Sequence, residues 1–469
     1  MNPSSLDVYQ RRRRLDADIT RMAWPVIVSL LVVNAIELID IAMLSRLGRD
    51  SVAAVGYSAQ YVHLVVTSLQ AVAIASVALM ARSVGGGDLE RARAAFAAGC
   101  SFSLCIAGVA VGIVWLAPEV PLGLLGATPS VSGLAIPYFR LVMTGTLLVA
   151  LDSSIESAYR ARKNTRVPLL AVIATGITKL ALNLLLVFGL LGFPRLGLEG
   201  AGIATLAAHG TGLAVYWLAR RTDTEPAEQR LTPSWSALRR HSRTLAEMAR
   251  VAVPALGERL VMNVALLAYF SILSRSYGGA AIAAYAIGVR LLAFSWIPGL
   301  GFSVAAATLV GQALGRRDVD SARQAGWRSV RLALIVMACL GVAVAFLRGP
   351  LARGFTADTA ILEDLVPFLL TLAMAQPFMG VHFTLSGALR GAGDTMTPFL
   401  GAALGNWLLR VPLAYYFATR GSSVVWVWSA LVGDHIARSV WSVWAFRSGR
   451  WGRGFESATR GATTGELVR

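Results

Sequence analysis

Residues 24–45 read WPVIVSLLVVNAIELIDIAMLS, an apolar run in which Glu37 and Asp40 are the only charged side chains. A helix that crosses the hydrocarbon core of a bilayer needs about 20 residues of this kind. The whole chain has 469 residues, of which 56% are apolar and 15% are charged. Because a soluble protein carries about 25% charged residues, the sequence predicts an all-α polytopic membrane protein.

Eleven further apolar runs follow the first. The twelve expected transmembrane helices lie at residues 24–45, 53–81, 95–117, 133–157, 167–190, 198–219, 251–273, 281–311, 331–348, 361–388, 398–417 and 424–445. The longest polar stretch separates the sixth run from the seventh. We therefore expect an N-terminal tail at 1–22, a six-helix lobe at 23–219, a cytoplasmic linker at 220–250, a second six-helix lobe at 251–446 and a C-terminal tail at 447–469.

The net charge of +17 reflects topology rather than nucleic-acid binding. Thirty of the 43 lysines and arginines fall in the termini and the even-numbered connections, whereas seven fall in the odd-numbered ones. Basic residues concentrate on the cytoplasmic side of membrane proteins, so we expect both termini in the cytoplasm and the chain in the plasma or inner membrane. The first apolar run is too long for a cleavable signal peptide.

Several functional classes are excluded by what the chain lacks. Its only lysines, Lys163 and Lys179, stand outside any GxxxxGK[ST] motif, which argues against a self-contained ATP-driven pump. The three cysteines lie in apolar runs without CxxC or zinc-site spacing. We therefore expect neither an enzyme nor a bound cofactor or metal centre. The expected coupling ions are protons, with sodium ions as the alternative.

The two halves of the chain repeat each other at an offset of 230 residues, or 229 near their beginnings. Leu79, Gly85, Asp88, Ala92, Arg93, Arg160, Thr165 and Pro168 match Leu309, Gly315, Asp318, Ala322, Arg323, Arg390, Thr395 and Pro398, and Asn34 and residues 44–46 match Asn263 and residues 273–275. Six spans per half give both halves the same orientation. The lobes are thus expected to be pseudo-symmetric, with the substrate site at their interface and transport by alternating access.

The motifs in these repeats carry a family resemblance. GALRGAGDTMTP (387–398), YRARKNTRVP (159–168), LVGQALGRRDVDSAR (309–323), ALMARSVGGGDLERAR (78–93), LGLEGAGIAT (196–205) and IELIDIAMLSRLG (36–48) resemble the multidrug and toxic compound extrusion (MATE) family, over essentially the whole chain. The resemblance is closest to the DinF-like bacterial branch. It implies export of amphipathic, often cationic compounds against a proton or sodium gradient.

The first span carries a polar stripe. Asn34, Glu37 and Asp40 lie within an arc of about 120° on one helix face, which suits the interior of a lobe better than lipid. Acids inside hydrocarbon are candidates for function because a charge there is costly. By resemblance, the first-span acid of the family falls on Asp40. A carboxyl group at that depth can exchange a proton for a cation.

The fifth span departs from the family pattern. TKLALNLLLVFG (178–189) places Asn183 where many relatives have a second acid, and Lys179 where they have an asparagine. A sodium ion needs several oxygen ligands around a net negative charge, which an ammonium opposes. Lys179 is instead expected to pair with Asp40, and protonation of Asp40 would release that pair.

Other candidates lie deeper in the chain. Asp152 is an acid of the fourth span, and Glu258 stands seven or eight residues into the seventh. Some branches of the family carry their seventh-span acid further along, where this sequence has Met262, so an acidic site in the second lobe is not expected from the resemblance.

Three polar residues of the second lobe complete the candidate set. His382 could relay protons, and Gln376 lies six residues earlier on the same helix. A hydrogen-bonded core histidine is an alternative reading of His382. Arg290 is expected to bond carbonyls or acids within its lobe.

We therefore expect a secondary antiporter that exports amphipathic or cationic organic compounds in exchange for protons. The alternatives are a sodium-coupled drug antiporter, a flippase for lipid-linked precursors of the same superfamily, and a non-transporting membrane receptor. The expected partners are small organic substrates and the lipid bilayer, without nucleic acid, and the expected state is a monomer.

The charge bias predicts the topology of two matched loops. Single cysteines placed within residues 82–93 and 316–331, on a cysteine-free background, should stay unlabelled by an impermeant thiol reagent in intact cells and should react in inverted vesicles. The reason is the excess of arginine in both loops. Labelling of either loop in intact cells would overturn this topology.

Overall fold

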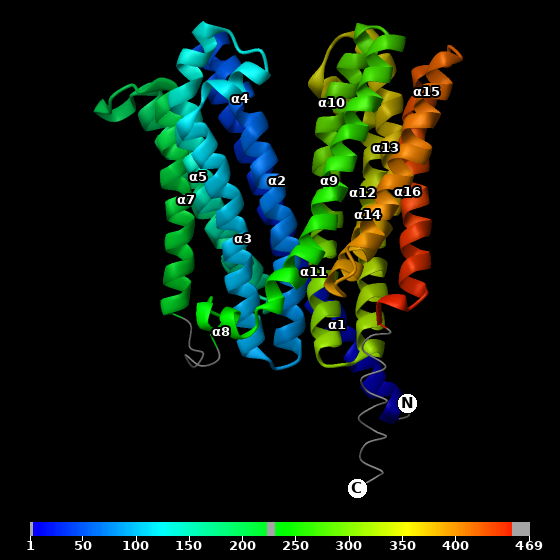
Figure 1. Cartoon of the computed structure of the whole chain (residues 1–469). Coiled ribbons are helices and arrows are strands. Elements are labelled where there is room, and N and C mark those ends of the chain that lie inside the picture. Colours follow the sequence, from blue (N-terminus) through cyan, green and yellow to red (C-terminus); the bar gives the residue numbers. More distant parts are fainter. Residues whose placement is uncertain (1–2, 223–229, 453–469) are drawn as a thin grey trace. The chain divides into compact units, whose positions relative to one another are not determined.

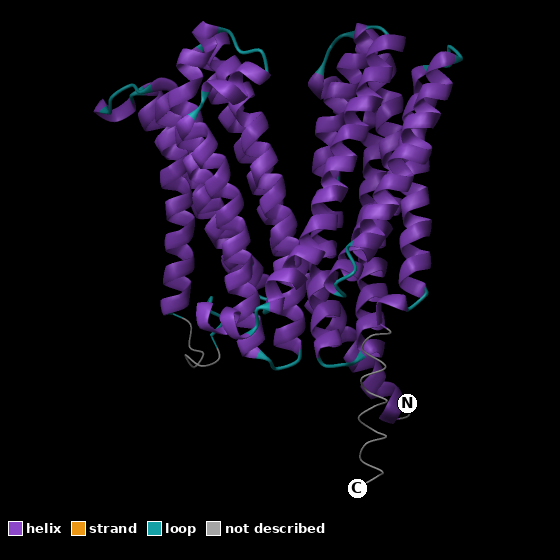
Figure 2. Cartoon of the chain, in the orientation of Figure 1, coloured by secondary structure: helices purple, strands orange, loops and turns teal. Residues whose placement is uncertain are grey.

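The computed structural model describes residues 3–222 and 230–452. In this part of the chain every regular element is a helix and no strand occurs (Figure 2). The expected all-α fold is thereby confirmed. It follows from the composition, because only a helix satisfies all of its backbone hydrogen bonds within one apolar segment.

Twelve membrane-length helical segments follow one another (Figure 1). They are α1 (Pro3–Leu44), α2 (Arg49–Gly85), α3 (Leu89–Leu116), α5 (Pro129–Ala161), α6 (Arg166–Leu182) with η2 (Asn183–Val187), α7 (Gly197–Arg221), α9 (Arg243–Ser276), α10 (Gly279–Ser295) with α11 (Ile297–Gly315), α12 (Val319–Phe355), α13 (Thr359–Gly391), α14 (Met396–Ala403) with η5 (Leu404–Arg410) and α15 (Val411–Thr419), and α16 (Val424–Arg447). Nine helices of the described part are long and apolar enough to span a membrane by length and composition alone.

Short helices fill the connections, namely η1 (Ser45–Leu47), α4 (Glu119–Leu124), η3 (Leu190–Gly192), α8 (Trp235–Arg240) and η6 (Arg450–Gly452). Two long helices begin well before the apolar runs that mark them in the sequence. The first run begins at residue 24, but α1 begins at Pro3, and α9 begins at Arg243 rather than at residue 251. Hydropathy locates the membrane segment, whereas helical hydrogen bonding continues into polar sequence.

The matched loops of the repeat are built alike. Asp88 caps α3 by accepting a hydrogen bond from the Arg91 backbone N–H, and Asp318 caps α12 by accepting from that of Ser321. Each side chain satisfies a backbone donor that a helix start leaves open. Burial alone would raise the pKa of Asp318, but the hydrogen bonds from Ser321 and the charge of Arg11 lower it overall.

The chain packs into two compact units. The first contains the described residues of 28–84, 88–222 and 230–252, and the second contains residues 3–27, 85–87 and 253–452. Two of the crossings between units lie inside a long helix and close to a proline, Pro25 in α1 and Pro254 in α9. These prolines are 229 residues apart, the offset of the repeat. A proline inside a helix removes one hydrogen bond, so both helices are weakened at matched points.

Small residues bring α11 and α13 together in the second unit. A Cβ atom added to Gly387 would lie 2.2 Å from the Ser303 carbonyl oxygen, and one added to Gly391 would lie 2.1 Å from the Ala307 carbonyl oxygen. Glycines four residues apart let two membrane helices approach at backbone distance. The close crossing of α11 and α13 therefore requires glycine at both positions.

Replacing Gly387 with alanine should lower the thermal unfolding temperature of the purified protein, because a backbone carbonyl cannot move out of the way. Overpacking of this kind costs about 1–3 kcal/mol. The matched control is Gly354→Ala in α12, where nothing lies within 4 Å of the added Cβ atom. Equal unfolding temperatures for the two variants would contradict the close crossing.

Candidate functional site

The first unit joins Asp40 to two side chains of the fifth span. The Lys179 ammonium lies 2.9 Å from Asp40 Oδ2, and the Asn183 amide Nδ2 donates to Asp40 Oδ1 at 2.6 Å. The Asp40 and Lys179 side chains are 14% and 20% exposed. Both carboxylate oxygens therefore have a donor, and the pair expected from the sequence is present.

Local packing explains how these residues meet. A Cβ atom on Gly176 would lie 2.1 Å from Ile36 Cδ1, so the glycine lets α1 approach α6 one turn from Lys179. Immediately afterwards α6 widens into the π-helical segment η2, which begins at Asn183. Single π-turns often occur at functional sites because they redirect side chains. Asn183 is fully buried there, and its Oδ1 has no partner among the described residues.

The rest of the polar stripe stays outside this cluster. Asn34 donates to the Leu30 carbonyl oxygen of its own helix at 2.8 Å. Glu37 is exposed and forms no ion pair with any described residue, although its charge interacts with those of Lys179 and Asp40. Of the three stripe residues, Asp40 is the one that the structure places in a pairing site.

Asp152 has a partner that sequence reasoning missed. Its Oδ2 lies 3.0 Å from Nδ1 of His209 on α7, while its Oδ1 is buried without a partner in the described part of the chain. The two residues lie 57 positions apart. Nearer the end of the same helix, Glu156 pairs with Arg160 as their i,i+4 spacing suggests.

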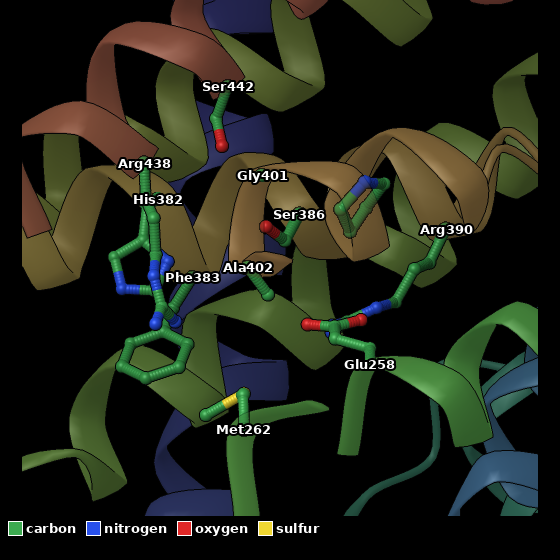
Figure 3. Close-up of a pocket in the computed structure, with 11 residues that line it drawn as sticks. Glu258, Met262, His382, Phe383, Ser386, Arg390, Gly401, Ala402, Arg438 and Ser442 are labelled. Atoms are coloured by element: carbon green, nitrogen blue, oxygen red, sulfur yellow. The ribbon is translucent and has the colours of Figure 1, made fainter. Parts of the chain in front are cut away.

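Glu258 is also paired across a long sequence distance. Both of its carboxylate oxygens accept hydrogen bonds from Arg390 Nη2, at 2.6 and 2.7 Å. The pair lines a cavity of the second unit together with Met262, His382 and Ser386 (Figure 3). Glu258 is thus the partner of a motif arginine, and the hydroxyl and imidazole groups nearby make this cavity polar on one side.

Two stacked histidines lie next to that cavity. His382 Nε2 and His435 Nδ1 are 3.1 Å apart, and their ring planes differ by 19°. Within α16, Arg438 donates to both oxygens of Asp434, at 2.6 and 2.9 Å. Both histidines are buried and share one hydrogen bond, so His382 is a bonded core residue in this arrangement.

The last two candidates do not join these clusters. Gln376 is fully buried, and neither atom of its amide has a hydrogen-bond partner among the described residues. Arg290 is exposed on α10, and no hydrogen bond or ion pair of its side chain occurs within the described residues. The structure therefore does not bring Gln376 or Arg290 to His382.

The family model MatE matches residues 25–185 and 254–416. The chain belongs to the MATE family of membrane transporters. The two matched segments begin 229 residues apart, in agreement with the repeat. A probable multidrug resistance protein NorM of Thermotoga maritima is 26% identical over 427 residues, or 88% of each chain. A probable NorM of Bradyrhizobium diazoefficiens is 30% identical over 419 residues, or 87% of this chain and 88% of the relative.

The fold of this MATE protein also matches a solved transporter. The bent form of the Vibrio cholerae MATE transporter VcmN superimposes with a TM-score of 0.82 over 95% of this chain and 98% of that chain, at 23% identity. As a member of the MATE family, the protein is a multi-pass membrane transporter and not an enzyme. The narrower resemblance to the DinF-like branch stays a prediction.

The Asp40–Lys179 pair generates a prediction about stability. Asp40→Asn should lower the thermal unfolding temperature, because it leaves the ammonium of Lys179 without its counter-ion. Breaking a buried pair costs about 3–5 kcal/mol, and partial exposure reduces that cost. The double variant Asp40→Asn/Lys179→Gln should recover part of the loss. Additive losses in this double-mutant cycle would show that the two side chains do not interact.

Proposed function

We propose that this MATE protein exports amphipathic organic compounds in exchange for protons, and that Asp40 is the group that binds the coupling proton. The observation that carries the proposal is the cluster in which one part-buried ammonium and one amide hold the Asp40 carboxylate. The probable multidrug resistance proteins among the relatives support drug-like substrates.

Protonation of Asp40 changes the forces between α1 and α6. In the charged state the carboxylate attracts Lys179 and accepts from Asn183. A proton on Asp40 removes the negative charge, and Lys179 then lies in a part-buried site without its counter-ion. Because an unpaired buried charge is unfavourable, the ammonium and α1 have reason to move apart. That movement couples proton binding to a change in the lobe.

The donor geometry favours a proton over sodium. A sodium ion at Asp40 would need free carboxylate oxygens and further oxygen ligands. Here Oδ2 faces an ammonium and Oδ1 faces an N–H donor. Since the acceptor at Oδ1 is a carboxylate, the amide nitrogen of Asn183 must point toward it. Both carboxylate oxygens thus accept from donors. A proton on the carboxyl group can displace these donors, whereas a metal cation would be repelled by them.

The energy of one proton is sufficient for useful export. A hundredfold outward concentration of solute costs about 2.7 kcal/mol. One proton that enters yields about 2.3 kcal/mol per 100 mV of membrane potential, with about 1.4 kcal/mol for each unit of pH difference.

In this account the protein acts as a monomer in the plasma or inner membrane. Residues 1–22, 220–250 and 447–469 lie on the cytoplasmic side, and the lobes comprise residues 23–219 and 251–446.

Efflux from proteoliposomes under one imposed ion gradient at a time tests the proposal. A pH gradient should drive efflux of a cationic dye by the wild-type protein, and a sodium gradient alone should not. Asp40→Asn should abolish the driven efflux while the protein still folds. The matched control, Asp50→Asn, changes an exposed acid at the start of α2 and should transport normally.

Two results would contradict this proposal. One is efflux driven by sodium at zero pH gradient and unaffected by a protonophore, which would identify sodium as the coupling ion. The other is normal proton-driven efflux by Asp40→Asn, which would place the coupling proton elsewhere.

A further inference from the structure

The second unit contains the counterpart of the Asp40 site, but without its carboxylate. At the 229-residue offset of the repeat, Tyr269 of α9 occupies the place of Asp40 in α1. The helix that corresponds to α6 supplies a cation here as well, because Arg410 is the last residue of the π-helical segment η5. The centre of its guanidinium group lies 4.7 Å from the centroid of the Tyr269 ring.

Within the described residues, Arg410 has no acidic partner. Its side chain belongs to a residue that is 7% exposed, and its Nε and Nη2 atoms are buried without a hydrogen-bond partner among the described residues. The acids Asp434 and Glu258 already have other partners. Asp434 accepts two hydrogen bonds from Arg438, and Glu258 accepts two from Arg390.

Further unused donors surround this guanidinium group. The Tyr285 hydroxyl and His435 Nε2 are both buried without a partner in the described part of the chain. Both residues interact electrostatically with Arg410. If His382 Nε2–H donates to His435 Nδ1 across their 3.1 Å contact, the proton of His435 lies on Nε2. Arginine, tyrosine and histidine then all present hydrogen-bond donors.

A set of hydrogen-bond donors around an unpaired cation favours the binding of an anion. The face of Tyr269 offsets only part of the cost of burying the guanidinium group, and a water molecule would satisfy hydrogen bonds without neutralising the charge. His382, which is bonded to His435, lines the polar cavity shown in Figure 3 together with Arg438.

We propose that Arg410, Tyr285 and His435 form an anion-binding site inside the second unit, which takes one halide ion or one carboxylate group. The anion replaces the carboxylate that Asp40 supplies in the first unit. The two kinds of anion would come from different sources. A halide would be a resident ion from solution, whereas a carboxylate would belong to an acidic or zwitterionic compound. The site belongs to the second unit and Asp40 to the first, and the inference does not rest on proton coupling at Asp40.

Anion binding can be measured on the full-length protein in lipid nanodiscs. Sodium chloride or sodium acetate is titrated against sodium methanesulfonate, a bulkier anion, at constant ionic strength and pH, and the thermal unfolding temperature is recorded. A ligand that binds the folded state raises this temperature in a saturable way. Binding of radioactive chloride, measured by scintillation proximity, gives the affinity directly. A response to chloride identifies a halide site, and a response to acetate alone identifies a carboxylate site.

Three variants locate the site. Arg410→Gln should abolish the response, and Tyr285→Phe should weaken the apparent affinity about tenfold by removing one donor to a charged acceptor. The matched control is Arg420→Gln, which removes an exposed arginine that also lies over a tyrosine ring, that of Tyr416, and should respond as the wild type does. If Arg410→Gln does not fold, Tyr285→Phe decides the question.

Clear results would overturn the inference. The site is refuted if neither chloride nor acetate changes the unfolding temperature of the wild type. It is also refuted if Arg410→Gln or a folded Tyr285→Phe variant binds the anion as tightly as the wild type. None of these results bears on proton-driven efflux through Asp40.

Discussion

The cost of placing a charge in hydrocarbon organises both units of this protein. A charged side chain in a membrane helix needs a partner of opposite charge or a polar environment. The acids of the spans accordingly form pairs, namely Asp40 with Lys179, Asp152 with His209, Glu258 with Arg390 and Asp434 with Arg438. Three of the four join helices that are distant in sequence, so the pairs determine which helix faces meet. Arg410 is an informative departure, because it is buried and its Nε and Nη2 atoms have no partner among the described residues.

The internal repeat provides two similar frames with different chemistry. Both halves contain a proline inside a long helix, in α1 and α9, an aspartate cap, on α3 and α12, and a π-helical segment. The charged pair at Asp40 does not repeat. One frame holds an acid against a lysine, and the other holds an arginine against a tyrosine. The two halves therefore share backbone features, whereas the side chains that could bind an ion differ between them.

The sequence predicts the fold well because its signals are local. Apolar length gives the spans, and the matched loops give the repeat. It also predicts the Asp40–Lys179 pair, since an acid and a lone intramembrane lysine each need a partner. The pairing of Asp152 with His209 or of Glu258 with Arg390 leaves no local trace, because the partners lie 57 and 132 residues apart.

The sequence also does not predict where α1 begins or where the π-helical segments lie. Hydropathy does not report how far a helix extends into polar sequence, and a single wider turn changes hydrogen bonding without changing the apolar pattern. The tenth-span candidates show the same limit. Gln376 and His382 share a helix, but the structure pairs His382 with His435 of α16 instead.

The central claim is that the charge of Asp40 holds α1 against α6. Spin labels at Ile39 and Ile177, two exposed positions on these helices, allow pulsed electron paramagnetic resonance to measure the distance between them at alkaline and at acidic pH. The account predicts one distance at alkaline pH and a second, altered distance at acidic pH. In Lys179→Gln this dependence on pH should disappear. A wild-type distance distribution that is the same at both pH values would contradict the claim.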